Sequence, residues 1–404
     1  MQHQAKPTVS VVIATRNRRP LLEQALASVG AQEKAGELFE LETIVVDDAS
    51  SDDTPEAMRR RNDIRYIRLD VNCGLASARN TGIEASSGDY IAFLDDDDLW
   101  LPYKLAVLLP VLEADPDSAV AYGQIIVRSE NRVSVWPDAR IAPNGSIFRE
   151  LLRNSYAGMN SCLVRREAFA TAGCFDETLR SNIDYDMSLR LAFHFRFRFV
   201  PAPVAIYRAS RQGIFLSAAA EERTNFRRVI DKALALLEPV SPEDAQLGRE
   251  ARARVGLRVA DLLDMTGDLE RMRAHVLKAL QEFPWIAGEP WARSWIARKV
   301  RRLALAAESP VAVAQAFAQQ ARQAAGPRGL RERLALRLLL SEIWAELASG
   351  LRAMRGAARE AGYAAFCAVL QNPAKLGPGL SLMIFRALIT CGPARLPTVL
   401  RSPR

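Results

Sequence analysis

The sequence predicts an α/β domain with a parallel sheet over residues 1–215, followed by an all-α domain over residues 216–404. Strand-like and helix-like segments alternate through the first 100 residues. Beyond residue 220 the composition shifts to Ala, Leu and Arg at helical spacing, without a convincing strand. Charge divides at the same place, since residues 1–220 carry 25 Lys and Arg against 29 Asp and Glu, whereas the remainder carries 29 against 18. This division predicts two domains with different surroundings.

Local patterns justify the elements in chain order. The β-branched run at 9–14 is too continuous for a half-exposed strand and predicts a buried parallel one. Further strands are expected at 44–46, 64–69, 90–94, 119–127, 161–164 and 197–207. Helices are expected at 21–29, from residue 53, and at 75–85, 101–113, 167–172 and 184–192. Strand and helix in alternation imply right-handed crossovers and helices on both faces of the sheet.

The composition excludes several classes of protein. Of the 404 residues, 49% are hydrophobic and 25% are charged, which is typical of a globular chain and not of a disordered one. Five scattered cysteines without a C-x-x-C spacing indicate neither a disulfide framework nor a zinc site. No signal peptide and no apolar stretch of membrane-spanning length is visible. We therefore expect a cytoplasmic protein.

Polar residues gather where the predicted strands end. Thr15, Arg16 and Asn17 follow the first strand, Asp47 and Asp48 follow the second, and the run 95–98 follows the fourth. In open parallel sheets, ligands bind outside the carboxyl ends of the strands. The sequence therefore predicts a binding site at this edge.

The run 95–98 consists of four aspartates directly after an apolar strand. Clustered carboxylates repel one another unless a divalent cation or many donors neutralise them, which predicts a Mg²⁺ or Mn²⁺ site. The alternative is a solvated acidic turn in which Asp97 or Asp98 caps the following helix. Leu99 breaks the patterns of haloacid-dehalogenase-type phosphatases and of prenyl-chain enzymes, and the Gly and Glu of a calcium loop are missing. A metal that bridges the phosphates of a nucleotide remains.

Taken together, the motifs of residues 7–212 resemble family 2 glycosyltransferases, which have the GT-A fold. The residues that carry the resemblance are Val9 to Arg18, Ile44 to Thr54, Asn72 to Gly82, and the D-x-D element Asp95, Asp96 and Asp97. The resemblance implies a GT-A domain that binds a nucleotide sugar through Thr15, Asn17, Asp48, Arg79 and Asp95. It places a Mn²⁺ or Mg²⁺ ion at Asp95 and Asp97. From the residues alone, Arg79 in a structural ion pair and Asp48 as a turn or cap residue remain alternatives.

Farther along, the segment 182–190 resembles the part of the family that carries the general base, which falls on Asp184. A carboxylate there would take the proton of the acceptor hydroxyl as its oxygen attacks the anomeric carbon. The alternative is that Asp184 is a helix N-cap. The sequence departs from the family pattern at Ile183, in place of an acidic residue, and at Ser210, in place of a histidine.

The resemblance implies transfer of a sugar from a nucleoside diphosphate donor, expected to be a UDP-sugar, with inversion at the anomeric carbon. We expect the acceptor to be a glycan or a lipid-linked molecule of surface polysaccharide or glycolipid synthesis, and expect no nucleic acid partner.

In the helical half, Trp285, Trp291 and Trp295 precede the basic stretch 298–302. This pattern favours either peripheral contact with the inner face of the cell membrane or an aromatic core with a solvated basic face. A non-catalytic GT-A scaffold and a metal-dependent phosphohydrolase remain alternative functions.

Overall fold

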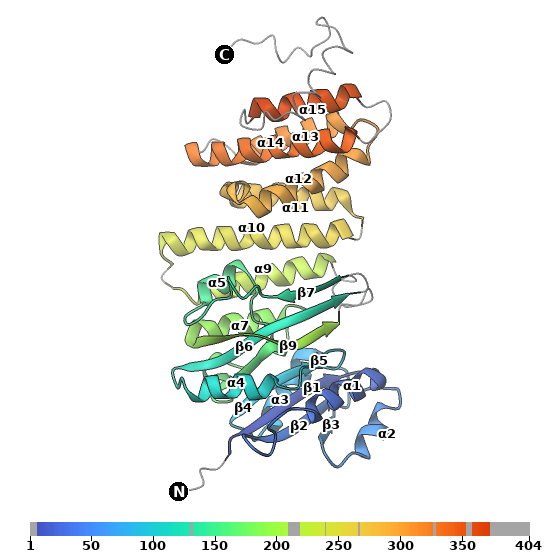
Figure 1. Cartoon of the computed structure of the whole chain (residues 1–404), viewed down its shortest axis with the longest axis vertical. Helices are drawn as coiled ribbons and strands as arrows, with labels where there is room; N and C mark the ends of the chain where they lie inside the picture. Colours follow the sequence, from blue (N-terminus) through green and yellow to red (C-terminus); the bar gives the residue numbers. More distant parts are fainter. Residues whose placement is uncertain are drawn as a thin grey trace, which may run out of the picture. The chain divides into compact units, whose positions relative to one another are not determined.

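The computed structural model describes residues 6–129, 132–208, 219–238, 240–265, 267–325, 329–352 and 358–371 (Figure 1). The chain forms two compact units, Met1–Gly248 and Arg249–Arg404. The sequence predicts a boundary at residue 215, whereas the two units of the structure meet at residue 248. The boundary lies later because the helix Ala219–Ala235 packs on the helix Ile183–His194 of the first unit.

Strands and helices alternate in the first half of the first unit, as the sequence predicts. The strands are β1 (Thr8–Thr15), β2 (Glu40–Asp47), β3 (Arg65–Arg68), β4 (Tyr90–Asp95), β5 (Leu99–Trp100), β6 (Ser118–Ser129), β7 (Arg132–Trp136), β8 (Cys162–Arg165) and β9 (Arg196–Arg208). The helices of this unit are α1 (Arg19–Gly30), α2 (Thr54–Arg59), α3 (Leu75–Ala85), α4 (Lys104–Glu113), α5 (Phe148–Arg153), the 3₁₀ turn η1 (Met159–Ser161), α6 (Ala168–Ala172), α7 (Ile183–His194) and α9 (Ala219–Ala235). The strand β7, the helix α5 and the short strand β5 were not predicted.

Within the described residues the strands form one mixed sheet in the order β3-β2-β1-β4-β8-β6-β9-β5, and β7 pairs with β6. The first four strands of this order are parallel to one another. The remaining pairs are antiparallel, except β6 with β9. The parallel half brings the carboxyl ends of β1, β2 and β4 to one edge of the sheet, which is where the predicted site residues lie.

Both faces of the parallel half are covered by helices, which explains the continuous apolar strands. On one face, Val9, Val11 and Ile13 of β1 pack in a cluster with residues of α1 and α4. On the other face, a smaller cluster joins β1 and β2 to α3. Gly82 of α3 lies so close to β1 that a Cβ atom there would be 2.2 Å from the Cγ1 atom of Val12. Only glycine permits this close packing of α3 on the sheet.

Helix α7 is fixed to α9 by a buried charge cluster. The Asp186 carboxylate, which is buried, accepts the Nε–H of Arg190 one turn later at 2.9 Å and forms an ion pair with Lys232 of α9 at 2.7 Å. Lys232 also contacts Asp176 at 2.6 Å. Next to this cluster the rings of Tyr185 and Phe226 meet edge to face at 6.1 Å. Helix α9 is therefore part of the first unit.

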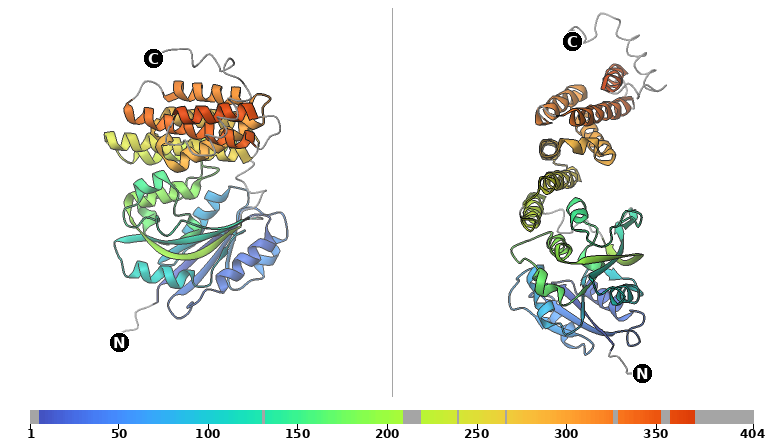
Figure 2. Two further views of the ribbon diagram at one scale, coloured as in Figure 1. Left: turned by 45° about the horizontal axis from the view of Figure 1, so that its top comes forward. Right: turned by 90° about the vertical axis from the view of Figure 1, so that its left-hand side faces the viewer.

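In the second unit every described element is helical, as the sequence predicts. The helices are α10 (Pro242–Met265), which begins before the boundary, α11 (Leu269–Glu282), the 3₁₀ turn η2 (Pro284–Gly288), α12 (Pro290–Leu305), α13 (Pro310–Ala325), α14 (Leu330–Arg352) and α15 (Ala358–Gln371). Figure 2 shows the later helices of this unit packed side by side. Small side chains such as Ala348 and Ala364 line the contact of α14 with α15, where they let the helices approach closely.

The Asp186 cluster yields a prediction about stability. Replacing Asp186 by Ala leaves Lys232 and Arg190 without their buried partner, so we expect a loss of about 3 kcal/mol in the free energy of unfolding. Urea unfolding followed by tryptophan fluorescence measures this loss. As a control, Glu37→Ala removes only an exposed pair with Lys34 and should leave the midpoint unchanged. Equal midpoints for Asp186→Ala and the native protein would contradict the prediction.

Candidate active site at the carboxyl ends of the parallel strands

The structure brings the polar residues at the strand ends together. In the register of the sheet, Thr15 of β1 lies opposite Asp47 of β2, and Ala14 lies opposite Asp95 of β4. The backbone N–H of Asp48 donates to the carbonyl of Thr15 at 2.9 Å. The predicted common edge is therefore present.

Asp48 anchors the start of helix α3. Its two carboxylate oxygens accept the backbone N–H groups of Cys73, at 2.6 Å, and of Gly74, at 2.9 Å. Gly74 has a φ of 89°, a conformation that favours glycine. Asp48 is buried. Of the two interpretations that the sequence leaves open, these contacts correspond to the turn or cap residue, while contact with the nucleotide stays a prediction.

Thr15 and Asn17 tie neighbouring loops together. The Thr15 hydroxyl donates to Asp96 Oδ2 at 2.8 Å. Asn17, which has a positive φ of 54°, accepts the backbone N–H of Ser51 on its side-chain oxygen at 2.7 Å. These contacts fix the loop after β1 against the loop after β2 and against the acidic run. Both residues thus shape the edge at which the donor is predicted to bind.

The four aspartates of the run 95–98 alternate between partly exposed and buried side chains. Asp95 and Asp97 keep 30% and 36% of their side-chain surface exposed, whereas Asp96 and Asp98 are buried. Burial raises the pKa of Asp96 to about 6, against the opposing hydrogen bond from Thr15 and the charge of Arg18. Burial, and next the charge of Asp95, raise the pKa of Asp98 to about 8. The segment therefore has two outward carboxylates, Asp95 and Asp97, which are partly exposed, and two buried ones, Asp96 and Asp98.

Arg79 joins the acidic run to Asp184. Its guanidinium is buried, and it donates to Asp95 Oδ1 at 2.7 Å and to Asp184 Oδ1. The rings of Phe93 and Phe175 lie 5.6 and 5.2 Å from its central carbon. Burial opposes the charged form, but the two carboxylates outweigh burial and raise the pKa of Arg79. This is the ion pair that the sequence left as an alternative to contact with the nucleotide.

Asp184 is the second residue of α7 and not its cap, because the cap position is Asn182 and makes no side-chain cap hydrogen bond. Its side chain is 32% exposed. Burial raises the pKa of Asp184, the charge of Asp95 adds to this, and Arg79 opposes it. A carboxylate with a raised pKa and partial access to solvent suits a general base.

Asp95 and Asp97 are the residues that can hold a divalent cation. Their recorded contacts use Oδ1 of Asp95, with Arg79, and Oδ2 of Asp97, with Arg18 at 2.9 Å. Among the described residues, no group of three or more His, Cys, Asp or Glu side chains is arranged to hold a metal. This donor set fits Mg²⁺ or Mn²⁺, which are commonly bound by one or two carboxylates together with substrate phosphates.

Sequence reasoning missed three residues that contact the acidic run or support it. They are Arg18, which contacts Asp96 and Asp97, Arg208, whose backbone N–H donates to Asp98 at 2.9 Å, and Lys104, which donates to the Asn160 carbonyl. Lys104 was detectable as a lone cation that precedes eight apolar residues of its helix. Of the two departures from the family pattern, Ile183 is a buried residue at the start of α7, and Ser210 lies outside the described residues.

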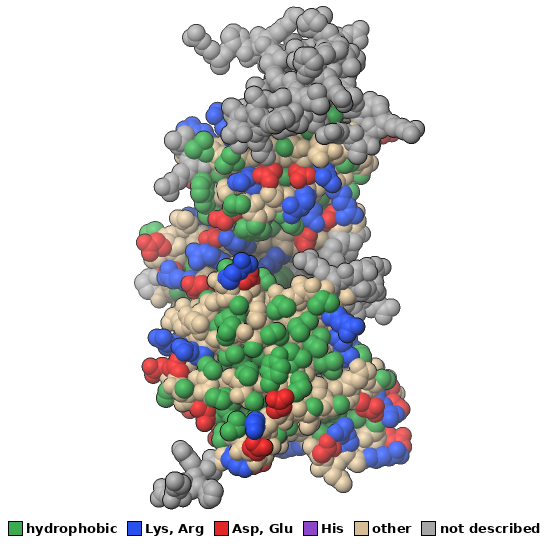
Figure 3. Space-filling view, viewed as in Figure 1, with side chains coloured by type: hydrophobic (Ala, Val, Ile, Leu, Met, Phe, Trp, Pro, Cys, Tyr) green, Lys and Arg blue, Asp and Glu red, His purple; other side chains and the backbone are tan. Residues whose placement is uncertain are grey.

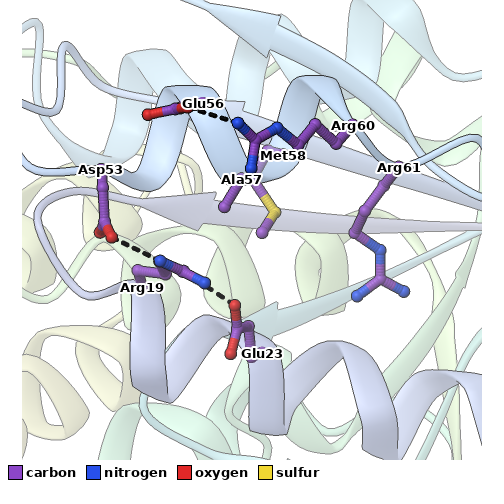
Figure 4. A pocket seen from close by; sticks show the side chains of 8 residues that line it. All are labelled: Arg19, Glu23, Asp53, Glu56, Ala57, Met58, Arg60 and Arg61. Carbon is purple, nitrogen blue, oxygen red and sulfur yellow. Dashed lines mark hydrogen bonds and ion pairs between the residues drawn. The ribbon is translucent and has the colours of Figure 1, made fainter.

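A cavity of about 500 Å³ between α1 and α2 is separate from this edge (Figure 4). Its charged lining is satisfied internally, because Arg19 pairs with Glu23 and Asp53, and Arg60 pairs with Glu56. None of the predicted site residues lines the cavity. It is therefore not part of the candidate active site.

Hydrophobic side chains also gather on one face of the first unit over β6, β7 and β9 (Figure 3). On β7 the exposed apolar residues are Val133, Val135 and Trp136. The Trp136 ring stacks on Tyr156 at 5.8 Å, and its indole N–H donates to the Ser155 carbonyl. These residues are distinct from the acidic run and from Asp184.

In the second unit, the basic stretch is largely paired with acidic side chains. Lys299 contacts Asp261 at 2.7 Å and Asp264 at 2.6 Å, and Arg302 also contacts Asp264, at 3.0 Å. The Lys299 ammonium lies 5.1 Å from the Trp295 ring. These contacts reduce the free positive charge that the sequence suggests for a membrane surface. Among the described residues, no helix is long and apolar enough to cross a membrane.

Comparisons with known proteins agree with this geometry. The model of the family "Glycosyl transferase family 2" matches residues 10–173. An uncharacterized glycosyltransferase of Haemophilus influenzae is 31% identical over 184 residues, which are 45% of this chain and 61% of that protein. The uncharacterized glycosyltransferase YwdF of Bacillus subtilis is 31% identical over 208 residues, which are 51% of this chain and 75% of that protein.

A solved structure shows the same fold. The structure of S. aureus TarS 1-349 in complex with UDP-GlcNAc matches with a TM-score of 0.53 at 18% sequence identity, covering 85% of this chain and 92% of that chain. This likeness confirms the predicted GT-A fold. With a relative matched over three quarters of its length, with the family model, and with the carboxylate edge described above, the chain belongs to glycosyl transferase family 2.

Proposed function

We propose that this protein is a metal-dependent, inverting glycosyltransferase that moves a sugar from a nucleoside diphosphate donor to an acceptor hydroxyl. The observation that carries the proposal is the placement of Asp95 and Asp184 on either side of the Arg79 guanidinium. One carboxylate belongs to the outward pair at the end of β4, and the other lies in the first turn of α7. Sugar transfer needs one carboxylate near the leaving diphosphate, as a metal ligand, and a second one near the attacking hydroxyl, as a base. The two must therefore lie close together.

Asp184 acts as the general base in this proposal. Its partly exposed carboxylate takes the proton of the acceptor hydroxyl while the hydroxyl oxygen attacks the anomeric carbon. Arg79 holds Asp184 and Asp95 at a fixed separation, so the carboxylate is oriented before the acceptor arrives.

Asp95 and Asp97 hold Mn²⁺ or Mg²⁺ in this proposal, together with the diphosphate of the donor. When bound, such a cation offsets the negative charge that develops on the leaving diphosphate. The partial exposure of both carboxylates supports this assignment. A UDP-sugar is the donor that we propose, as the family resemblance implies.

Asp97→Asn tests the metal ligand. The amide replaces a charged oxygen by a neutral one, so we expect Mn²⁺ to lose its effect on UDP affinity in the variant. Titration calorimetry with UDP, with and without Mn²⁺, measures this effect. Asp63→Asn serves as the matched control, because Asp63 is an exposed aspartate just before β3, at the opposite end of the parallel strands.

Undiminished metal dependence in Asp97→Asn would show that Asp97 is not a ligand. If the native protein itself binds UDP without any effect of Mn²⁺, the result favours the non-catalytic scaffold. If it releases phosphate from a nucleotide sugar in the absence of an acceptor, the result favours a phosphohydrolase.

Asp184→Asn tests the general base. The amide keeps the size of the side chain but cannot take a proton, so we expect kcat to fall by about 10² to 10⁴ while UDP binding stays unchanged. UDP released in the presence of an acceptor is measured for turnover, and calorimetry is used for binding. Turnover at the native rate would remove Asp184 from this role.

The pH dependence of kcat/KM gives an independent test. Asp184 must be ionised to accept a proton, and burial raises its pKa above the ordinary aspartate value of about 3.9. Activity should therefore fall as the pH is lowered through this raised pKa. At pH values above this pKa, activity should be retained until another group titrates. The profile is measured at saturating Mn²⁺, with circular dichroism at each pH to confirm that the fold is intact. An acidic limb at or below pH 4 would be inconsistent with the prediction.

A further inference from the structure

Lys104, at the start of α4, has no solvent exposure at all. Lysine is almost never fully buried without a charged partner, because desolvation of the ammonium is costly. The recorded partners of Lys104 in the described structure are neutral. Its Nζ atom donates to the Asn160 carbonyl at 2.6 Å and lies 3.9 Å from the centre of the Trp100 ring. Burial lowers the pKa of Lys104 to about 7, which shows how unfavourable the site is for a charge.

Within the described residues, one short segment supplies three hydrogen bonds to Asn160. Its side-chain Nδ2 donates to Asp98 Oδ2 at 2.5 Å, and its Oδ1 accepts the indole N–H of Trp100 at 3.1 Å. Its backbone carbonyl accepts from Lys104. Residues 98–104 therefore hold Asn160 through its side chain and its backbone at once. Asn160 is the middle residue of the η1 turn.

The segment just before the η1 turn is joined to the helix that carries the proposed base. The Ser188 hydroxyl of α7, one helical turn after Asp184, donates to the Ala157 carbonyl at 2.7 Å in a buried contact. Residues 98–104, which follow directly on Asp95 and Asp97, therefore hold a turn whose preceding segment is bonded to α7. A shift of this turn would displace α7 and with it Asp184. Displacements of about 1 Å in an active site can cost about 100-fold in rate.

We propose that Lys104 and Asn160 are positioning residues that hold the η1 turn, and through the Ala157–Ser188 hydrogen bond the helix that carries Asp184, in register with Asp95 and Asp97. This inference rests on the proposed function. It explains why a lysine occupies this interior position, since a methionine would fill the same space but leave the Asn160 carbonyl without a donor. Neither residue contacts the reacting groups directly.

Lys104→Met tests the positioning. We expect kcat for sugar transfer to fall 10- to 100-fold, while the affinity for UDP with Mn²⁺ stays within twofold of the native value. Turnover is measured as UDP released from UDP-glucose, UDP-galactose and UDP-N-acetylglucosamine with an acceptor present. Lys104→Gln retains an N–H donor and should recover part of the lost rate.

Leu112→Ala is the matched control, because it removes a buried side chain from the same helix far from the turn. It should lower the thermal midpoint but keep kcat close to native. If Lys104→Met keeps native kcat, or loses UDP affinity in proportion to its loss of turnover, the positioning proposal is wrong.

Amide hydrogen exchange of a peptide that covers 157–162 provides a readout that needs no activity. We expect exchange in this peptide to be at least 10-fold faster in Lys104→Met than in the native protein, and unchanged in Leu112→Ala. If the native protein transfers no sugar, the proposed function fails. Exchange then still decides whether Lys104 holds the turn, and equal exchange in Lys104→Met and the native protein overturns the proposal.

Discussion

The site depends on one buried guanidinium. Arg79 lies between Asp95 and Asp184, with the rings of Phe93 and Phe175 against it. A buried charge is tolerated only when it is paired and hydrogen-bonded, so the arginine requires both carboxylates and the carboxylates are fixed by the arginine. The end of β4 and the start of α7, which are far apart in sequence, are thereby held at a set distance. In the proposed reaction this distance separates the leaving diphosphate from the attacking hydroxyl.

The side chains of the acidic run 95–98 alternate between partly exposed and buried, and the two sets have different roles. Asp95 and Asp97 remain partly exposed, whereas Asp96 and Asp98 are buried. Asp96 is held by Thr15 and Arg18 at the end of β1, and Asp98 contacts Asn160. The buried pair fixes the loop that presents the outward pair. Four consecutive carboxylates are tolerated because hydrogen-bond donors satisfy the inner two.

Helix α7 has different partners on its two sides. Asp184 meets Arg79, while Asp186, two residues later, is buried against Arg190 and Lys232. Residues two apart on a helix point in different directions, so one short segment supplies both a base and an anchor. Through Lys232, helix α9 holds the helix that carries the base. This is why the first unit extends beyond the point at which the composition changes.

The sequence alone was sufficient for the alternation of strands and helices in the parallel half of the sheet, the edge at which the polar residues meet, and the family. Each of these depends on periodicity or on motifs that are contiguous in the chain. Only the tertiary structure decided what each side chain contacts. Asp48 binds two backbone N–H groups, Arg79 bridges two carboxylates, and Lys104 reaches Asn160. These contacts join residues that lie between 16 and 105 positions apart in the chain, and such pairings leave no local pattern because they arise only when the sheet and its helices pack together.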